Sequence, residues 1–340
     1  MRPPDIAFET IGTTALALQT APGFSFAVAR DGEVAFENGY GFADVERRSL
    51  VEERTRFAIG SITKQFTAVA ILLLAQQGGL SLDDRLAKYL PEFPNGSAIT
   101  IRMLINQTSG LHNYPLLSEH PWPLSGRISL DSLLRILATD KPDFAPGTKW
   151  AYSNTNYAVL SAIIARVAET DEASFLQANI FGPLKMTESG FGYAAQQRPE
   201  VALPYHGHGS FKPQEPIVSL DLTAGAGAMV SSATDLTVWN IALMQGALLD
   251  TESMQALWTS GKLRDGKSVA YAMGFVPATL AGHRVLWHNG LAPGAGGYCL
   301  NAIFPDAKLA VVVLSNGYNF SGAAEQIVAH VLAAYYPKRD

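Results

Sequence analysis

The fold class is decided by residues 24–36, FSFAVARDGEVAF, near the start of a chain of 340 residues. Large apolar residues alternate with small ones from Phe24 to Val28, and the alternation resumes at Val34 after Asp31-Gly32. Apolar residues at every second position are typical of a half-buried strand. Asp-Gly between two such runs is a strong hairpin signal. The stretch therefore predicts two antiparallel strands joined by a tight turn.

The other strand signals lie near the C-terminus, after residue 268. Strands are predicted over residues 270–277, 284–287, 297–304 and 308–314. The run Val-Val-Val-Leu at 311–314 is typical of a strand buried on both faces. Helices are predicted close to the two ends of the chain, over 5–18 with Asp5 as N-cap and over about 321–336.

Between about residues 80 and 250 the pattern becomes helical. Apolar residues recur at i, i+3, i+4 and i+7 from Leu160 to Val167, which is the stripe of an amphipathic helix. Residues 129–139 and 234–245 are also predicted to be helical. Proline and glycine divide the region into short helices and long loops.

These patterns predict an α+β fold of the α/β-sandwich type. Residues 1–80 and 255–340 are expected to form one antiparallel sheet flanked by helices. A mainly helical domain, residues 81–254, is inserted between them. A cleft between two such domains is the expected place for a small-molecule site.

The composition excludes several classes of protein. Hydrophobic residues make up 48% of the chain and charged residues 16%, so the chain is not of the disordered class. The net charge is −5 and no cluster of Lys and Arg interleaves with aromatic residues, so no nucleic-acid partner is expected. The longest apolar run, residues 68–75, is too short to span a bilayer. Because the first ten residues lack a signal-peptide core, we expect a cytoplasmic protein or the mature form of an exported one.

Cysteine and histidine give no sign of a disulfide, a metal or a cofactor. The single cysteine, Cys299, cannot form an intrachain disulfide. His206-Gly207-His208 has no HExxH motif or zinc-ligand spacing beside it, so we expect no metal. No glycine-rich phosphate loop follows a predicted strand, so we expect no cofactor. The sequence does not indicate the oligomeric state.

Ser61 and Lys64 form the first candidate catalytic pair, just before the apolar-rich stretch 65–74. Positions i and i+3 share a helix face, and a serine hydroxyl needs a base to become a nucleophile. A lysine can be that base when burial and the positive end of a helix lower its pKa. The alternative is that Ser61 is an N-cap and Lys64 a solvated residue, because S-x-x-K alone is weak evidence.

Tyr152-Ser153-Asn154 is the second candidate. A tyrosine flanked by positive charges can act as a base, and the Asn154 amide can bond to a substrate amide or to Lys64. Asn113 and Tyr114 are candidates for lining the acyl pocket. The alternative for each of these residues is ordinary loop packing.

The third candidate is His288-Asn289-Gly290-Leu291, at the end of a predicted strand. A glycine there lets a substrate approach the backbone closely, and the N–H of Leu291 can form an oxyanion hole with that of Ser61. His288 can supply a positive charge or a hydrogen bond. Any dependence on that charge is expected to appear as an ionisation in the kcat/KM profile. The alternative is a histidine in an ordinary turn.

The motifs at 61–64, 152–154 and 288–290 resemble, in order, the three motifs of the class C β-lactamase-like serine hydrolases. This superfamily includes class C β-lactamases, DD-carboxypeptidases, D-aminopeptidases and related carboxylesterases. The resemblance covers nearly the whole chain and implies the β-lactamase/transpeptidase-like fold. Further segments typical of the family are residues 39–44, 107–111 and 225–235.

The resemblance implies an acyl-enzyme mechanism. Ser61 would be the acylated nucleophile, and its N–H and that of Leu291 would form the oxyanion hole. Lys64 and Tyr152 would share the proton transfers, with Tyr152 activating Ser61 and later the deacylating water. Which of the two is the general base stays open.

The third motif departs from the Lys-Thr-Gly of class C β-lactamases, since no K-[ST]-G occurs in the chain. His288 replaces a permanent charge with one that titrates near neutral pH, which weakens recognition of a β-lactam carboxylate. We therefore expect a serine hydrolase for small esters or D-amino-acid amides and peptides, with weak or absent β-lactam hydrolysis. The alternatives are a true class C-type β-lactamase and a penicillin-recognising or peptidoglycan-sensing domain with slow turnover.

Overall fold

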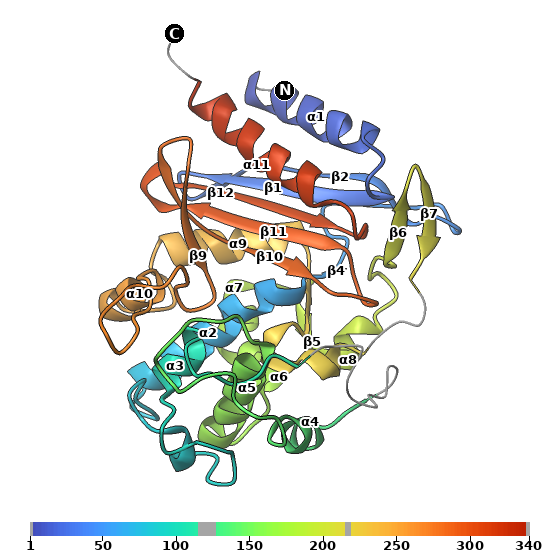
Figure 1. Cartoon of the computed structure of the whole chain (residues 1–340). Coiled ribbons are helices and arrows are strands. Elements are labelled where there is room, and N and C mark those ends of the chain that lie inside the picture. The colour runs from blue at the N-terminus through green and yellow to red at the C-terminus, as the bar shows by residue number, and fades with distance from the viewer. Residues whose placement is uncertain (1–2, 115–126, 215–218, 338–340) are drawn as a thin grey trace.

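The computed structural model describes residues 3–114, 127–214 and 219–337. A seven-stranded sheet crosses the upper half of the view in Figure 1, and most helices gather below it. Its strands follow the order β3-β2-β1-β12-β11-β10-β9, and all neighbours are antiparallel. They are β1 (Gly23–Arg30), β2 (Glu33–Asp44), β3 (Ser49–Leu50), β9 (Val276–Leu280), β10 (His283–Leu291), β11 (Tyr298–Phe304) and β12 (Leu309–Ser315). The predicted antiparallel sheet, built from both ends of the chain, is therefore confirmed.

The predicted hairpin is present and joins β1 to β2. Asp31 and Gly32 have φ angles of +52° and +85°, the left-handed backbone that Asp-Gly turns adopt. Strand β1 also pairs with β12, with Phe26 opposite Val313, and this pairing links the two ends of the chain. The expectation of a half-buried strand is wrong, because β1 is buried on both faces. Its alternation is between large and small apolar side chains, and helices cover both.

Helices α1 (Pro3–Ala17) and α11 (Ser321–Tyr335) cover one face of the sheet (Figure 1). The large side chains of β1, Phe24 among them, share an apolar cluster with α11. Helix α9 (Ala233–Met244) packs against β1 and β12 from the opposite side, where the small side chains of β1 lie. Since α1 begins at Pro3, Asp5 lies inside the helix and is not the predicted N-cap.

The remaining helices surround α2 (Thr63–Gln76) and α5 (Asn154–Ala168), which pack against each other. The other helices are α3 (Ile101–Ile105), α4 (Leu130–Leu137), α6 (Glu172–Leu176), α7 (Gly182–Leu184), α8 (Gly192–Gln196) and α10 (Thr251–Leu257). Short 3₁₀ segments are η1 (Gly60–Ile62), η2 (Leu86–Lys88), η4 (Leu220–Ala226) and η5 (Pro305–Ala307), and η3 (Gln177–Phe181) is a short π-helix. A three-stranded sheet contains β4 (Phe57–Ala58), β8 (Met229–Ser231) and β5 (Gly190–Phe191). A two-stranded sheet contains β6 (Tyr205–His208) and β7 (Ser210–Pro213). The domain boundaries at 80/81 and 254/255 remain predictions.

The strand predicted over residues 270–277 is wrong for most of its length, because β9 begins only at Val276. Met273 and Gly274 have φ angles of +36° and +89°, so the backbone turns there. A Cβ on Gly274 would lie 2.7 Å from the Lys64 carbonyl oxygen, which shows that this turn presses against α2. Within the described residues, no helix is long and apolar enough to cross a membrane.

The end of β10 and the η1 turn are in backbone contact. A Cβ on Gly290 would lie 1.8 Å from the Ile59 carbonyl oxygen. A Cβ on Gly60, where φ is +50°, would lie 2.8 Å from the backbone nitrogen of Leu291. No side chain larger than hydrogen fits between these segments. The sheet therefore fixes where α2 begins.

We expect Gly290→Ala to lower the free energy of unfolding by about 1–3 kcal/mol or more, because the new methyl group overlaps backbone atoms. The matched control is Gly322→Ala in α11, where a Cβ meets nothing within 4 Å. That change should be neutral or stabilising by up to about 1 kcal/mol. Urea unfolding of both variants measures the difference. Equal stabilities would contradict the close approach of β10 to η1.

Candidate active site

Ser61 lies at the start of a buried helix. After β4 the chain turns at Gly60, forms the single turn η1 and continues as α2. The Thr63 hydroxyl donates to the Gly60 carbonyl oxygen over 2.7 Å and holds this turn. The Ser61 side chain is partly exposed, whereas Lys64, one helical turn later, has no exposed surface. The serine side chain is therefore accessible from solvent, whereas the lysine behind it is enclosed by the protein.

Two proton-carrying groups converge on the Ser61 hydroxyl oxygen. The Nζ atom of Lys64 lies 3.0 Å from Ser61 Oγ, and the Tyr152 hydroxyl donates to the same oxygen over 2.7 Å. The Lys64 amine also donates to Asn154 Oδ1 over 2.9 Å and to the Ala226 carbonyl oxygen over 2.7 Å. Residues that are 91 positions apart in the chain thus meet at one atom.

The environment of Lys64 favours a neutral amine. Burial lowers its pKa well below the ordinary value of 10.5, and no carboxylate pairs with it among the described residues. A neutral amine has two N–H groups and one lone pair. Since Asn154 and Ala226 accept the two N–H bonds, the lone pair is left for the Ser61 hydroxyl. This geometry suits a base that removes the serine proton.

Tyr152 is a neutral phenol in this site. Burial raises its pKa above the ordinary value of 10, and the hydrogen bond to Ser61 only partly offsets this effect. The sequence interpretation required positive charges flanking the tyrosine, but the lysine beside it is itself held neutral. The structure thus places a proton donor, rather than a preformed phenolate, on Ser61 Oγ.

His288 is buried and does not titrate near neutral pH. Its Nδ1 donates to the Asn289 carbonyl oxygen over 2.6 Å, and its Nε2 accepts from the Tyr271 hydroxyl over 3.2 Å. Both ring nitrogens are therefore used by the neutral tautomer. Burial lowers the pKa of His288 to about 3. The expectation of a charge that appears near neutrality is wrong, because the ring is removed from water.

The other candidates occupy different positions around this centre. Gly290 and Leu291 lie against η1, so the Leu291 N–H comes close to the segment carrying Ser61. The strand alternation puts the Asn289 side chain on the face opposite His288, where it bonds to Tyr298. Its contribution here is its carbonyl oxygen.

Two candidates hold the start of α5 and the wall beside it. Asn113 Oδ1 accepts from the Asn154 backbone N–H over 2.8 Å, which fixes the first residue of α5. Tyr114 is buried, and its hydroxyl donates to the Leu222 carbonyl oxygen over 2.9 Å. Tyr114 therefore supports η4 from behind and offers no free surface to a substrate.

Sequence reasoning missed two groups in the site. The Ala226 carbonyl oxygen binds Lys64, and the Tyr271 hydroxyl fixes His288. A backbone carbonyl has no residue-type signature, so only the fold reveals it. Tyr271 lies in the turn that was predicted to be a strand, and nothing in its local sequence marks it.

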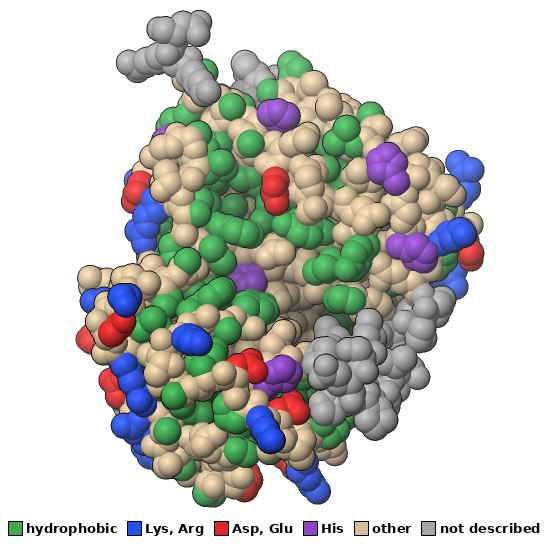
Figure 2. All heavy atoms as spheres, viewed as in Figure 1, with side chains coloured by type: hydrophobic (Ala, Val, Ile, Leu, Met, Phe, Trp, Pro, Cys, Tyr) green, Lys and Arg blue, Asp and Glu red, His purple; other side chains and the backbone are tan. Residues whose placement is uncertain are grey.

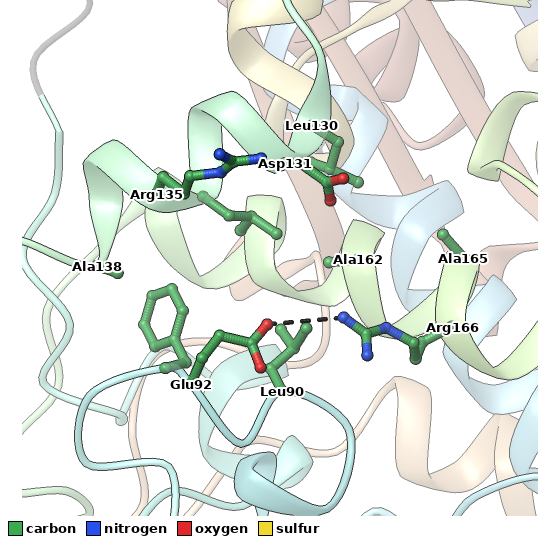
Figure 3. A pocket seen from close by; sticks show the side chains of 11 residues that line it. Leu90, Glu92, Leu130, Asp131, Arg135, Ala138, Ala162, Ala165 and Arg166 are labelled. Carbon is green, nitrogen blue, oxygen red and sulfur yellow. Dashed lines mark ion pairs between the residues drawn. The ribbon is translucent and has the colours of Figure 1, made fainter.

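In the space-filling view, the face seen in Figure 2 is hollowed between the sheet half and the helical half. A separate cavity of about 570 Å³ lies between α4, α5 and the segment near Leu90 (Figure 3). Arg166 and Glu92 form an ion pair of 3.6 Å across it, and none of the candidate catalytic residues lines it. Among the described residues, no three His, Cys, Asp or Glu side chains gather as a metal site.

Comparison with known proteins places this geometry in a family. The family model described as Beta-lactamase matches residues 13–335. A putative penicillin-binding protein PbpX from Bacillus subtilis (strain 168) is 31% identical over 294 residues, which are 86% of this chain and 70% of the relative. The chain spans 59–70% of the length of the first curated relatives that it matches.

Solved structures share the fold. The octameric penicillin-binding protein homologue from Pyrococcus abyssi has a TM-score of 0.82 and 26% identity, covering 98% of this chain and 77% of that one. The D-amino acid amidase from Ochrobactrum anthropi SV3 has a TM-score of 0.83, covering 98% of this chain and 99% of that one. Its identity of 22% shows likeness of fold alone. The chain therefore belongs to the Beta-lactamase family, within the superfamily of β-lactamase-like serine hydrolases that its sequence motifs resemble.

Proposed function

We propose that the chain forms an acyl-enzyme on Ser61 and hydrolyses small esters or D-amino-acid amides and peptides, with weak or absent β-lactam hydrolysis. One observation carries this proposal. Lys64 Nζ and the Tyr152 hydroxyl lie 3.0 and 2.7 Å from Ser61 Oγ, in a centre where burial favours the neutral form of both groups. Such a centre can take a proton from the serine and return it.

In acylation, Lys64 is the base. Ser61 passes its proton to the neutral amine while its oxygen attacks the substrate carbonyl carbon. The ammonium that forms keeps its bonds to Asn154 and Ala226 and lies 4.8 Å from the centroid of the Tyr152 ring, where a cation is attracted to the ring face. When Lys64 becomes charged in this step, its two hydrogen-bond acceptors, Asn154 and Ala226, are therefore already in place.

The backbone and Tyr152 complete the step. The N–H groups of Ser61 and Leu291 bind the oxygen that becomes anionic in the tetrahedral adduct. When the adduct collapses, the leaving oxygen or nitrogen takes a proton from the Tyr152 hydroxyl, which recovers one from Lys64. In deacylation, water attacks the ester, its proton passes to the same pair of groups, and Ser61 regains its hydroxyl.

The third motif bears on the class of substrate. A β-lactam presents a carboxylate, and recognition of that group benefits from a fixed positive charge. His288 is neutral and both of its nitrogens are bonded, so it offers no such charge. Together these points favour esters and D-amino-acid amides over β-lactams.

We expect a fluorophosphonate probe to label Ser61, and Ser61→Ala to remove the label without changing the unfolding midpoint. Mass spectrometry of the intact chain and its peptides locates the adduct. With the unlabelled enzyme, kcat/KM should be larger for a short-chain nitrophenyl ester or a D-amino-acid amide than for a chromogenic cephalosporin.

Two results would replace this function with one of its rivals. A larger kcat/KM on the cephalosporin would indicate a class C-type β-lactamase. A penicillin adduct on Ser61 that persists without product release would indicate a sensing domain, which the penicillin-binding relative makes worth testing. Absence of any adduct on Ser61 would contradict the proposed acyl-enzyme mechanism.

Lys64→Arg should lower kcat/KM by about 10²–10⁴-fold, because a guanidinium keeps the donors but cannot be deprotonated. In the unaltered enzyme, activity should fall on the acid side as Lys64 gains a proton, and the limb should lie well below the pKa of 10.5 of free lysine. Kinetics on a neutral ester from pH 5 to 10 measure both effects. His288→Gln should leave the midpoint of this limb in place, and a shifted midpoint would assign the ionisation to the histidine.

A further inference from the structure

Glu172 is a buried carboxyl group that the steps above do not use. It lies in the first turn of α6, is 3% exposed, and forms no ion pair within the described ranges. Its Oε1 lies 2.7 Å from Thr67 Oγ1, and its Oε2 accepts from the Ser161 hydroxyl. The same Thr67 oxygen lies 2.8 Å from the Gly225 carbonyl oxygen. Glu172 is thus linked through one hydroxyl to the backbone of η4.

Counting protons shows which form of Glu172 fits this arrangement. The three oxygen–oxygen contacts of 2.8 Å or less must each contain one hydrogen: Ser161 to Glu172, Glu172 to Thr67, and Thr67 to Gly225; the Thr63 carbonyl oxygen lies farther from Thr67 Oγ1, at 3.5 Å. The two hydroxyl groups supply two hydrogens. A protonated Glu172 supplies the third by donating from Oε1 to Thr67, so that Thr67 donates to the Gly225 carbonyl. An ionised Glu172 would take the Thr67 hydrogen and leave the Gly225 carbonyl oxygen without a donor.

The segment held by this chain of bonds also holds Lys64. Gly225 is followed by Ala226, whose carbonyl oxygen accepts from Lys64 Nζ. Lys64 and Thr67 are three residues apart on one face of α2, so two neighbouring carbonyls are fixed by two neighbouring side chains. A Cβ on Gly225 would lie 2.9 Å from Thr67 Oγ1 and 3.0 Å from Glu172 Oε2, which shows how tightly the segment is pressed against them.

The backbone here needs such a restraint. Ala224 has φ +40° and ψ −138°, a conformation that residues other than glycine rarely adopt and that costs free energy. The strain turns the next two carbonyls toward α2. If the Thr67 bond to Gly225 is lost, the segment can relax and carry the Ala226 carbonyl away from Lys64.

We propose that Glu172 is a positioning residue: in its protonated form it directs the Thr67 hydroxyl to the Gly225 carbonyl and so holds the Ala226 carbonyl on the Lys64 amine. This inference rests on the proposed function, because it assumes that Lys64 is the base for Ser61. Ionisation of Glu172 releases the segment and impairs the transfer of the serine proton. Glu172 itself touches no substrate.

Few other charged groups surround Glu172. Among the described residues, four elements contact Glu172, and three of them contain titratable residues. Helix α2 contains Lys64, α5 contains Tyr157 and Arg166, and η4 contains Asp221. The η3 segment contains no titratable residue. Arg166 is exposed at the far end of α5, and the Asp221 carboxylate accepts from the Tyr193 backbone N–H. Burial raises the pKa of Glu172 from 4.5 to about 7. Activity should therefore decline as pH rises through neutrality, in the opposite sense to the limb assigned to Lys64, along which activity rises with pH.

Glu172→Gln tests the role directly. The amide N–H₂ donates to Thr67 at every pH and the amide oxygen accepts from Ser161, so the variant should keep kcat below pH 7 and lose the alkaline decline. Ser161→Ala should move the decline to higher pH, because the Ser161 bond lowers the Glu172 pKa. Exposed Glu252→Gln in α10 is the matched control, and it should leave the profile of kcat against pH unchanged.

Thr67 offers a second, independent pair of variants. Thr67→Val keeps the shape of the side chain but removes the hydroxyl, and it should lower kcat by about 10- to 100-fold at all pH values because Lys64 loses its fixed acceptor. Thr67→Ser keeps the hydroxyl and should restore most of that loss. KM should change little in either variant.

Unfolding provides a readout that does not need a substrate. The folded-state pKa of Glu172 lies above its unfolded value, so the free energy of unfolding should fall as pH rises from about 4.5 to about 7. In Glu172→Gln this decline should be smaller over the same window. Urea unfolding at several pH values measures it.

The outcomes separate this inference from the proposed function. If the probe labels Ser61 but Glu172→Gln keeps the alkaline decline of the unaltered enzyme, the role of Glu172 is overturned and the acyl-enzyme stands. If Ser61 is never labelled, the proposed function fails whatever the profiles show. Loss of the decline in Glu172→Gln, with the control unchanged and Thr67→Ser active, supports the positioning role.

Discussion

The burial of one lysine amine, with no carboxylate partner among the described residues, is the constraint on which the site depends. A charged ammonium enclosed by protein and unpaired is very costly, so burial lowers the pKa of Lys64 and favours the neutral amine. Its two N–H groups still need acceptors, and these are the Asn154 side chain and the Ala226 carbonyl. Once both are satisfied, the remaining lone pair has one partner, Ser61.

The same physical condition applies to its neighbours. Tyr152, His288 and Glu172 are titratable, and burial shifts the pKa of each toward the neutral form. Each neutral form then matches its hydrogen-bond partners: a phenol that donates to Ser61, an imidazole that donates once and accepts once, and a carboxyl group whose Oε1 lies 2.7 Å from the Thr67 hydroxyl. In the proposed mechanism these groups are uncharged before the reaction, and charge develops only during it.

Assembly of this centre depends on close backbone contact between distant segments. The turn η1 supplies Ser61, helix α2 supplies Lys64, the loop before α5 supplies Tyr152, and η4 supplies a carbonyl. Strand β10 reaches η1 only because Gly60 and Gly290 lack side chains at the contact. The neutral histidine at the end of β10 then distinguishes this centre from one built to hold an anionic substrate by a fixed charge.

The sequence by itself determined most of the helices and strands and pointed to the candidate catalytic side chains, because both depend on local pattern. Alternation and the Asp31-Gly32 turn defined the sheet, and three short motifs identified Ser61, Lys64 and Tyr152. It did not determine protonation states, the Ala226 carbonyl as a ligand, or the turn at Met273-Gly274. These were decided by tertiary structure. A pKa depends on how far distant segments of the chain exclude solvent from the group. A backbone carbonyl is chemically the same in every residue, so only the fold determines which one lies against Lys64.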